Sequence, residues 1–482
     1  MDLSQLQPKP VWNFFNEICK IPRPSKHEEQ VLLWLKEFAN SRGLVHKSDA
    51  AGNLLISKPA SAGKESLPKV ILQAHVDMVC EKNSDVEFDF MAKAIEPWID
   101  GEWVKAKETT LGADDGIGIA AILAVFDDNK LEHGPLEALF TVDEETGLTG
   151  AFALEKDLLS GKILINLDSE DEGELFIGCA GGMKTTAVFK PEYISTPDNM
   201  QSIKISISGL RGGHSGDDIN KNRGNAIKIL NNILYNPDSV LPFMIAGFEG
   251  GNLHNAIPRE ASAILCVNVK DVEIVKNNVR ECLNKIAAEM PDETGFKFII
   301  EDAALPKNVM DAETVNGLME AITACPNGVI TWSTEMEGLV ETSTNLASVK
   351  LTSESEILIT TSQRSSIDND RKELAGRIRT LFEMAGAIAE SSEGYPGWKP
   401  NLASPILETT KYIYKSLFGN DPKVRAIHAG LECGLFLEKY PGMDMISFGP
   451  TLRDVHSPDE RLHIPTVDKF YKLLIGVLAA IE

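Results

Sequence analysis

Three short apolar runs, each followed at once by histidine or acidic residues, constrain the fold of this chain more than any other feature. They span Val70–Val76, Leu136–Val142 and Ile163–Leu167, and a helix-length run of small and apolar residues, Gly116–Phe126, separates the first two. Short apolar runs that alternate with helical segments are typical of an α/β fold with a largely buried sheet. The polar side chains that end such strands gather where these folds place their functional sites. The sequence therefore predicts an α/β domain with a mainly parallel or mixed central sheet.

The pattern changes after Gly181-Gly182 and changes back at the turn-rich segment Gly394–Pro400. Between these points the periodicity predicts the order strand, helix, strand, strand, helix, first over Ser202–Glu289 and again over Phe296–Ala389. Helices at 405–417 and 467–481 and a strand at 445–448 follow. We predict a discontinuous domain, residues 1–185 and 398–482, interrupted by an α+β lid domain, residues 186–397, that is built from two βαββα-like halves.

The charge of the chain excludes whole classes of partner. Asp and Glu number 71 against 47 Lys and Arg, which gives a formal net charge of -24, so the surface repels nucleic acid and anionic membranes. The seven cysteines form no C-x-x-C pair, which favours a reducing compartment over a disulfide framework. The first residues lack the features of a signal peptide, and the apolar runs are too short to cross a bilayer. These features predict a soluble, cytoplasmic protein without nucleic-acid or membrane partners.

Histidine and carboxylate side chains recur at the predicted strand ends. His75 and Asp77 lie two apart on one strand, so they share a face, and Asp77 can orient a metal-bound His75. Acidic residues follow at Asp114-Asp115, at Asp143-Glu144-Glu145 and at Asp168, and His456 follows the predicted strand at 445–448. Each alone is more often a helix cap or a solvated acid, but several like charges at buried strand ends are costly without cations. Together they predict a metal site.

In the order His75-Val76-Asp77, Gly112-Ala113-Asp114, Glu144-Glu145, Asp168 and His456, the chain resembles the cocatalytic zinc exopeptidases. That family includes carnosinases, aminoacylases, peptidase V and succinyl-diaminopimelate desuccinylase, and the resemblance covers essentially the whole chain. It implies a phosphorylase/hydrolase-like catalytic domain with two zinc ions. His75 and Asp168 are expected to bind one ion, Glu145 and His456 the other, and Asp114 to bridge them. Asp115 is the alternative bridge, and manganese or cobalt suits the same ligands.

The resemblance also implies roles for two further acids of the predicted catalytic domain. Glu144 is expected to be the general base that takes a proton from the hydroxide-forming water between the two metals and passes it to the leaving amine. Asp77 is expected to hold His75. The alternative for Glu144 is a surface acid beside a metal ligand.

Three lid residues resemble the family's substrate-binding groups. His214, in Gly209–Gly216, is expected to stabilise the tetrahedral oxyanion, and Asn255 and Arg364 are expected to bind the substrate's terminal carboxylate. The alternatives are an exposed histidine in a glycine loop and a structural, salt-bridged arginine. In simple homodimeric relatives this histidine comes from the partner subunit, whereas a duplicated lid supplies it within one chain.

These expectations lead to one function and two alternatives. We expect hydrolysis of unblocked L-dipeptides, including Xaa-His dipeptides such as β-alanyl-histidine, by a monomer or homodimer. If Arg364 binds the terminal carboxylate, the site measures substrate length. The first alternative is an N-acyl amino-acid amidohydrolase, which would use the same metals and the same carboxylate-binding residues. The second is a metal-binding scaffold protein without catalytic activity.

Overall fold

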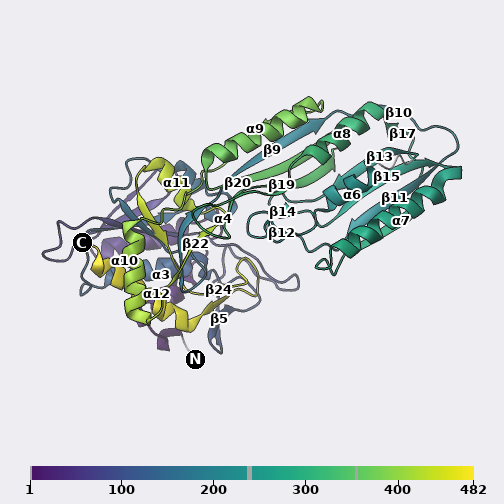
Figure 1. Cartoon of the computed structure of the whole chain (residues 1–482). Helices are drawn as coiled ribbons and strands as arrows, with labels where there is room; N and C mark the ends of the chain where they lie inside the picture. Colours follow the sequence, from purple (N-terminus) through teal and green to yellow (C-terminus); the bar gives the residue numbers. More distant parts are fainter. Residues whose placement is uncertain (1–2, 236–241, 353–355) are drawn as a thin grey trace. The chain divides into compact units, whose positions relative to one another are not determined.

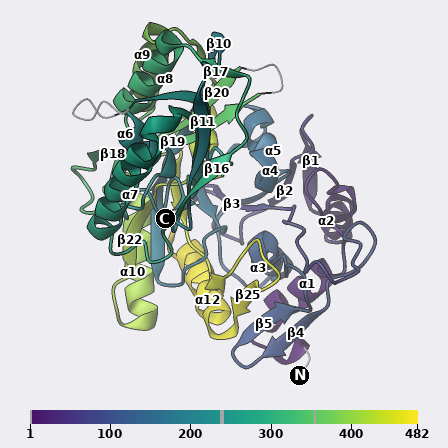
Figure 2. The same ribbon diagram turned by 90° about the vertical axis from the view of Figure 1, so that its right-hand side faces the viewer.

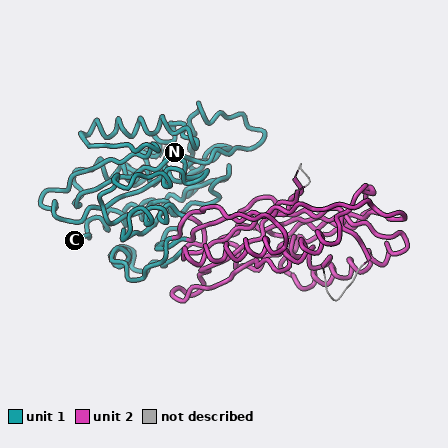
Figure 3. Tube along the Cα trace, turned by 90° about the horizontal axis from the view of Figure 1, so that it is seen from above, with its two compact units in different colours: residues 1–179, 398–426, 431–482 teal, residues 180–397, 427–430 magenta. Residues whose placement is uncertain are grey.

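The polypeptide crosses four times between two structural units in this computed structural model (Figure 3). Residues 3–235, 242–352 and 356–482 are described. Unit 1 contains residues 1–179, 398–426 and 431–482, and unit 2 contains residues 180–397 and 427–430. Two segments expected in the first domain, 180–185 and 427–430, belong to unit 2, because the first strand of the unit 2 sheet begins at Gly181.

The central sheet of unit 1 is mixed, and its strand order is β1-β2-β6-β3-β7-β23-β8-β22. The strands are β1 (Val45–Ser48), β2 (Leu54–Lys58), β3 (Val70–His75), β6 (Leu136–Thr141), β7 (Ile163–Asn166), β8 (Glu174–Cys179), β22 (Lys423–Ile427) and β23 (Asp444–Ser447). The four inner strands β6, β3, β7 and β23 are parallel, whereas β1, β2 and β8 pair antiparallel. The predicted α/β class with a mixed sheet is confirmed. Parallel strands bring their carboxyl ends to the same edge.

Helices and a small second sheet, of order β24-β25-β5-β4, complete unit 1. These elements are η1 (Leu3–Gln5), α1 (Lys9–Ile18), α2 (Glu29–Ser41), β4 (Pro97–Asp100), β5 (Trp103–Ala106), α3 (Ala113–Asp127), α4 (Glu144–Gly147), α5 (Thr149–Ala153), α10 (Pro405–Phe418), α11 (Glu432–Lys439), β24 (Leu452–Arg453), β25 (Arg461–His463) and α12 (Ile464–Ala480). Helix α3 packs between α1 and β3, and its small apolar residues are buried on all sides. This explains its lack of amphipathic periodicity.

Unit 2 is built around one antiparallel sheet of order β16-β11-β15-β13-β19-β20-β9-β21, with β18 paired to β19. Its elements are β9 (Gly181–Phe189), β10 (Tyr193–Ser195), β11 (Met200–Ser208), β12 (Gly213–His214), α6 (Ala226–Leu234), β13 (Phe243–Gly250), β14 (Ala256–Ile257), β15 (Ala261–Asn268), η2 (Val269–Asp271), α7 (Val272–Glu289), β16 (Lys297–Ala303), β17 (Asn308–Met310), α8 (Ala312–Ala324), β18 (Gly328–Trp332), β19 (Val340–Leu351), β20 (Ile357–Ser365), α9 (Asp368–Met384) and β21 (Ile388–Ser391). Figures 1 and 2 show helices α6 to α9 on one face of this sheet, where a single apolar core joins them to it.

Both halves of unit 2 contain the predicted order of strands and helices, but the strand pairing crosses between the halves. The strand expected to open the second half, at 296–300, is β16, and it pairs with β11 of the first half. From the middle of the sheet to its two edges, the strand orders are β13-β15-β11-β16 and β19-β20-β9-β21. Strand β9, which precedes both halves in the sequence, therefore occupies the position in the second half that β11 occupies in the first. The helix expected at 371–389 ends at Met384, and Gly386, at a φ of +90°, precedes β21. Periodicity locates a strand but does not identify its partner.

The helices of the structure can be compared with the requirements for crossing a membrane. Among the residues that the structure describes, none of the helices combines the length and the hydropathy that crossing a bilayer requires.

Candidate metal centre and active site

The predicted ligands of unit 1 converge on the carboxyl edge of its parallel strands. His75 is the last residue of β3, and Asp168 follows the end of β7 by two residues. Glu145 lies in the first turn of α4, which begins three residues after β6. The remaining two, Asp114 and His456, come from the turn that opens α3 and from the loop after β24. Residues far apart in the sequence therefore meet at one place because their strands are neighbours.

Asp114 faces both histidines, one with each carboxylate oxygen. Its Oδ1 lies 2.9 Å from His75 Nε2, and its Oδ2 lies 3.3 Å from His456 Nε2. The same nitrogen of His75 is 3.4 Å from Asp168 Oδ1, and that of His456 is 3.0 Å from Glu145 Oε2. Two sets of donor atoms thus share one carboxylate, which is the arrangement required of a bridging ligand.

Asp115 is directed elsewhere. Its carboxylate is buried, and Oδ1 accepts a hydrogen bond from the backbone nitrogen of Gly118 at 3.1 Å. The peptide bond between Asp114 and Asp115 is cis. The contacts of the two carboxylates, with Asp114 facing both histidines and Asp115 facing Gly118, favour Asp114 over Asp115 as the bridge.

The spacing of the donor atoms fits divalent cations. Ligand atoms about 2.0–2.2 Å from a tetrahedral zinc ion lie about 3.3–3.6 Å from each other. The four nitrogen–oxygen distances of 2.9–3.4 Å are close to that range. His75, Asp114 and Glu145 each also offer a ligand atom within 4.8 Å of the other two. Imidazole and carboxylate groups are ligands that zinc, manganese and cobalt all accept.

The protonation energetics of the centre also favour cations. Burial alone would lower the pKa of His75, but the carboxylates of Asp168 and Asp114 raise it well above its ordinary value. Burial, followed by the negative charge of Asp114, raises the pKa of Asp168 to about 7. The hydrogen bonds to Asp114 and Glu145 raise the pKa of His456 to about 11. The centre therefore retains protons where bound cations would neutralise the same charge.

Asp77 links His75 to the start of helix α4. Its Oδ1 is 3.4 Å from His75 Nδ1, so the other ring nitrogen of His75 is the one that faces Asp114. The two carboxylate oxygens also accept hydrogen bonds from the backbone nitrogens of Glu144, at 3.0 Å, and Glu145, at 3.2 Å. The Ser25 hydroxyl donates a further hydrogen bond to Oδ2 at 2.7 Å. One carboxylate thus orients a histidine and fixes the backbone beside it.

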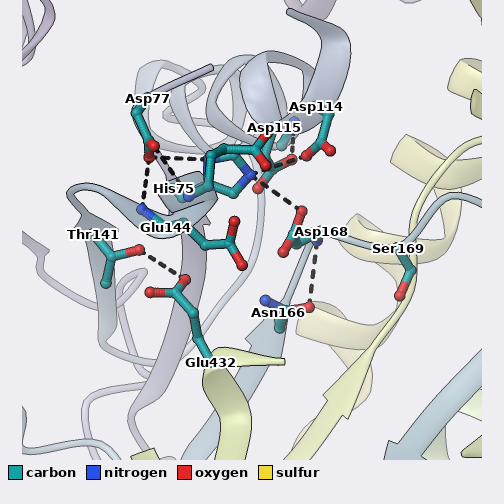
Figure 4. Close-up of polar contacts among 12 residues, drawn as sticks. His75, Asp77, Asp114, Asp115, Thr141, Glu144, Asn166, Asp168, Ser169 and Glu432 are labelled. Atoms are coloured by element: carbon teal, nitrogen blue, oxygen red, sulfur yellow. Dashed lines mark hydrogen bonds and ion pairs between the residues drawn. The ribbon is translucent and has the colours of Figure 1, made fainter. Parts of the chain in front are cut away.

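Glu144 presents its side chain to the centre. Figure 4 shows its carboxylate directed into the space bordered by His75, Asp168 and Glu432. Burial, together with the negative charges of Asp168 and Glu432, raises the pKa of Glu144 well above its usual range, although His75 opposes the shift. A carboxylate with a raised pKa beside a metal centre is suited to accept and return a proton.

Two residues that support the Asp114 turn were not predicted from the sequence. Glu460, fully buried, accepts hydrogen bonds from three consecutive backbone nitrogens, those of Leu111, Gly112 and Ala113, at 2.7–2.9 Å. Arg23 donates to the carbonyl oxygens of Val76, Asp77 and Gly112 and so ties this turn to the end of β3. Gly112 has a φ of +67°, and a Cβ there would lie 2.7 Å from the Arg23 guanidinium. The only feature of the sequence that points to Glu460 is its position in the same segment as the predicted ligand His456.

The three residues predicted in the lid lie together in unit 2. His214 Nε2 is 3.3 Å from Arg364 Nη2, and Arg364 Nη1 donates to the Tyr395 hydroxyl at 3.1 Å. The backbone nitrogen of Ser215, next to His214, donates to the carbonyl oxygen of Asn255 at 2.8 Å. Arg364 is buried, and its Nε has no hydrogen-bond partner within the described part of the chain. Unpaired guanidinium nitrogen in a buried position is suited to an anionic ligand.

Sequence comparison gives matches along the whole chain. The family model described as "Peptidase family M20/M25/M40" matches residues 71–480. The chain is 43% identical over 483 residues to the cytosol non-specific dipeptidase of Escherichia coli strain K12, an alignment that covers 100% of this chain and 99% of that protein.

Solved structures agree in fold. The aminoacylhistidine dipeptidase of Vibrio alginolyticus superposes with a TM-score of 0.92 at 42% identity and covers 100% of this chain and 98% of its own. The aminopeptidase PepT of Bacillus cereus superposes with a TM-score of 0.58 at 17% identity over 99% of both chains, which shows a common fold.

Proposed function

Because the chain belongs to peptidase family M20/M25/M40, we propose that it is a metal-dependent dipeptidase that hydrolyses unblocked L-dipeptides, including Xaa-His dipeptides. The full-length relative from Escherichia coli and the structural neighbour from Vibrio alginolyticus are both named as dipeptidases. The observation that carries the proposal is the convergence of His75 and His456 on the two oxygens of Asp114. The cytosolic name of the first relative supports a cytoplasmic location.

The proposed cofactor is a pair of zinc ions, for which manganese or cobalt can substitute. His75 and Asp168 would hold one ion, His456 and Glu145 the other, and Asp114 both. When bound, such a pair lowers the pKa of coordinated water and polarises the carbonyl group of the scissile bond. In this proposal unit 1 is the catalytic domain and unit 2 is the lid.

The proton transfers are assigned to Glu144. Its carboxylate takes one proton from water as the water oxygen bonds to the scissile carbonyl carbon. The same carboxyl then gives that proton to the amine nitrogen as the carbon–nitrogen bond breaks, so Glu144 ends the reaction unchanged. Asp77 holds the backbone of Glu144 in place during both transfers.

The residues of unit 2 are assigned to substrate recognition. His214 would donate a hydrogen bond to the developing oxyanion, and Arg364 with Asn255 would bind the terminal carboxylate. The repeated strand order in the two halves of unit 2 favours the proposal that His214 acts within its own chain, which activity of a monomeric form would support. A carboxylate clamp at a fixed distance from the scissile bond would limit substrates to two residues.

The test is hydrolysis by the purified protein, before and after chelation and zinc restoration. The substrates are Ala-His, β-alanyl-histidine, acetyl-histidine and a tripeptide. We expect zinc-dependent cleavage of the free dipeptides only, with a loss of about 10²- to 10⁴-fold in Glu144→Ala. The exposed acid Glu438, changed to alanine, is the control for loss of one negative charge. Preferred cleavage of acetyl-histidine would establish an amidohydrolase instead, and bound zinc without turnover of any substrate would leave a scaffold.

A further inference from the structure

A buried acid outside the expected ligand set lies beneath the metal centre. Glu432 begins helix α11 and is completely buried. Its Oε2 accepts two hydrogen bonds, from Gln73 Nε2 at 2.7 Å and from the Thr141 hydroxyl at 2.8 Å. Among the residues that the structure describes, none forms a hydrogen bond with its Oε1. The two acceptor bonds of Oε2 are therefore what this side chain contributes to its surroundings.

Both donors to Glu432 lie directly under the proposed ligands. Gln73 precedes His75 by two residues on β3, so their side chains are on the same face of the sheet. Thr141 is the register partner of His75 on the neighbouring strand β6. Gln73 Nε2 also lies 3.1 Å from the Thr141 hydroxyl oxygen, and these three side chains form one connected group.

The group continues to the other side of the centre. Asn166, the register partner of Gln73 on β7, donates from Nδ2 to Gln73 Oε1 at 2.5 Å. Its Oδ1 accepts a hydrogen bond from the Ser447 hydroxyl and a longer one, 3.4 Å, from the backbone nitrogen of Asp168. Figure 4 shows the two ends of this chain, Thr141 with Glu432 on one side and Asn166 with Asp168 on the other.

The hydrogen bonds from Glu432 through Gln73 and Asn166 to Asp168 all run in one direction, and the acceptor at Glu432 sets that direction. A side-chain amide has a donor end and an acceptor end, and the two can be exchanged by rotation. Because Glu432 Oε2 accepts from the Thr141 hydroxyl and from Gln73 Nε2, Gln73 turns its nitrogen toward Glu432 and its oxygen toward Asn166. Asn166 must then turn its nitrogen toward Gln73, which leaves its oxygen for the backbone of Asp168. Without an acceptor at 432, Gln73 Nε2 keeps only the Thr141 hydroxyl oxygen as its acceptor among the described residues, so Gln73 and Asn166 rotate more easily. A rotated Asn166 would present donor hydrogens to the backbone nitrogen of Asp168.

We infer that Glu432 is a positioning residue: through Gln73 and Asn166 it orients the backbone that carries Asp168, and so it selectively supports the ion shared by His75 and Asp168. The inference rests on the proposed two-metal function. The inference requires an acceptor oxygen at position 432 but does not require that oxygen to carry a negative charge.

The experiment measures metal binding rather than turnover. The apo-protein is titrated with zinc against a chromophoric chelator, and bound zinc is counted by mass spectrometry for wild type and variants. In Glu432→Ala we expect one of the two ions to bind about 10- to 100-fold more weakly, the usual effect of removing a residue that orients a ligand, with the other ion unchanged. Glu432→Gln keeps an acceptor oxygen and should restore wild-type affinity at both positions. Glu438→Ala, an exposed acid of the same helix, is the matched control.

A second variant covers the case in which Glu432→Ala does not fold. Gln73→Glu has nearly the same shape but offers an oxygen where Nε2 now donates, and it should weaken the same single ion. Wild-type affinity in the folded alanine variant or in Gln73→Glu would overturn the inference, as would equal damage in Glu432→Gln. If wild type itself bound fewer than two ions, the proposed function would fail instead, and the same titration reports that directly.

Discussion

The Oδ1 oxygen of Asp77 accepts a hydrogen bond from the backbone nitrogen of Glu144 at 3.0 Å. The residue expected to orient a ligand therefore also anchors the residue expected to transfer protons. This contact connects metal binding to proton transfer through a single carboxylate, and it makes Asp77 more sensitive to substitution than an ordinary neighbour of a ligand.

The first prediction concerns that carboxylate. Asp77→Ala removes the partner of His75 Nδ1 and the acceptor for two backbone nitrogens. We expect zinc affinity to fall about 10- to 100-fold and dipeptide hydrolysis to fall further, since Glu144 is also released. Ser25→Ala removes only one donor to Asp77 and should have a much smaller effect. Zinc affinity at the wild-type level in Asp77→Ala, measured by chelator competition, would show that His75 is oriented by other groups.

The second prediction separates the two candidate bridges. Asp114→Asn weakens both ion positions, because each oxygen of Asp114 faces a different histidine. Asp115→Asn should retain two zinc ions, because its amide oxygen can still accept from the backbone of Gly118. Counting bound zinc in the two purified variants decides the matter. Loss of zinc from Asp115→Asn with retention in Asp114→Asn would reverse the assignment.

The third prediction concerns Arg364. Replacing its guanidinium in Arg364→Met should raise the KM for Ala-His about 10- to 150-fold, the equivalent of a charged hydrogen bond of about 1.5–3 kcal/mol. The zinc content should be unchanged, because Arg364 lies in unit 2 and the proposed ligands lie in unit 1. Arg377→Met, on the exposed surface of α9, is the matched control. An unchanged KM in steady-state kinetics would leave Arg364 as a structural residue only.

The fourth prediction is a dependence of stability on pH. Burial, followed by the positive charge of Arg364, lowers the pKa of His428 from 6.5 to about 3. The unfolded chain binds a proton there below about pH 6.5 that the folded chain does not bind, so the free energy of unfolding falls as the pH is lowered from about 6.5 toward 3. This one group contributes at most about 1.4 kcal/mol per pH unit.

Denaturant unfolding of wild type and His428→Gln at several pH values measures this contribution. The difference in stability between the two proteins should shrink as the pH falls through this window. His27→Gln, at an exposed histidine, serves as the control. A difference that stays constant from pH 7 to pH 4 would contradict the burial of a neutral His428.

Local sequence was sufficient to locate the groups at the strand ends. His75, Asp168 and the Glu144-Glu145 pair follow apolar runs of strand length, and parallel strands bring such positions together. The choice between Asp114 and Asp115 needed the backbone of one turn, which alternation and composition do not describe.

The supporting residues could not be predicted in the same way. Glu460 and Leu111 are 349 positions apart, and Glu432 and Gln73 are 359 apart, so each hydrogen bond depends on the folded topology. The pairing of β16 with β11 could not be predicted for the same reason, since it joins strands of the two halves. Periodicity describes one element at a time, whereas these contacts belong to pairs of elements.

The points where the chain first leaves unit 1 and first returns to it are hydrogen-bonded to each other. Cys179 and Trp398 exchange two backbone hydrogen bonds of 2.9 Å each. A segment whose two ends meet places no tension on its host, so segments of very different length can be inserted at such a junction. The intervening 218 residues (180–397) therefore have the form of an insertion into unit 1. The length of this insertion can change without altering the junction between Cys179 and Trp398.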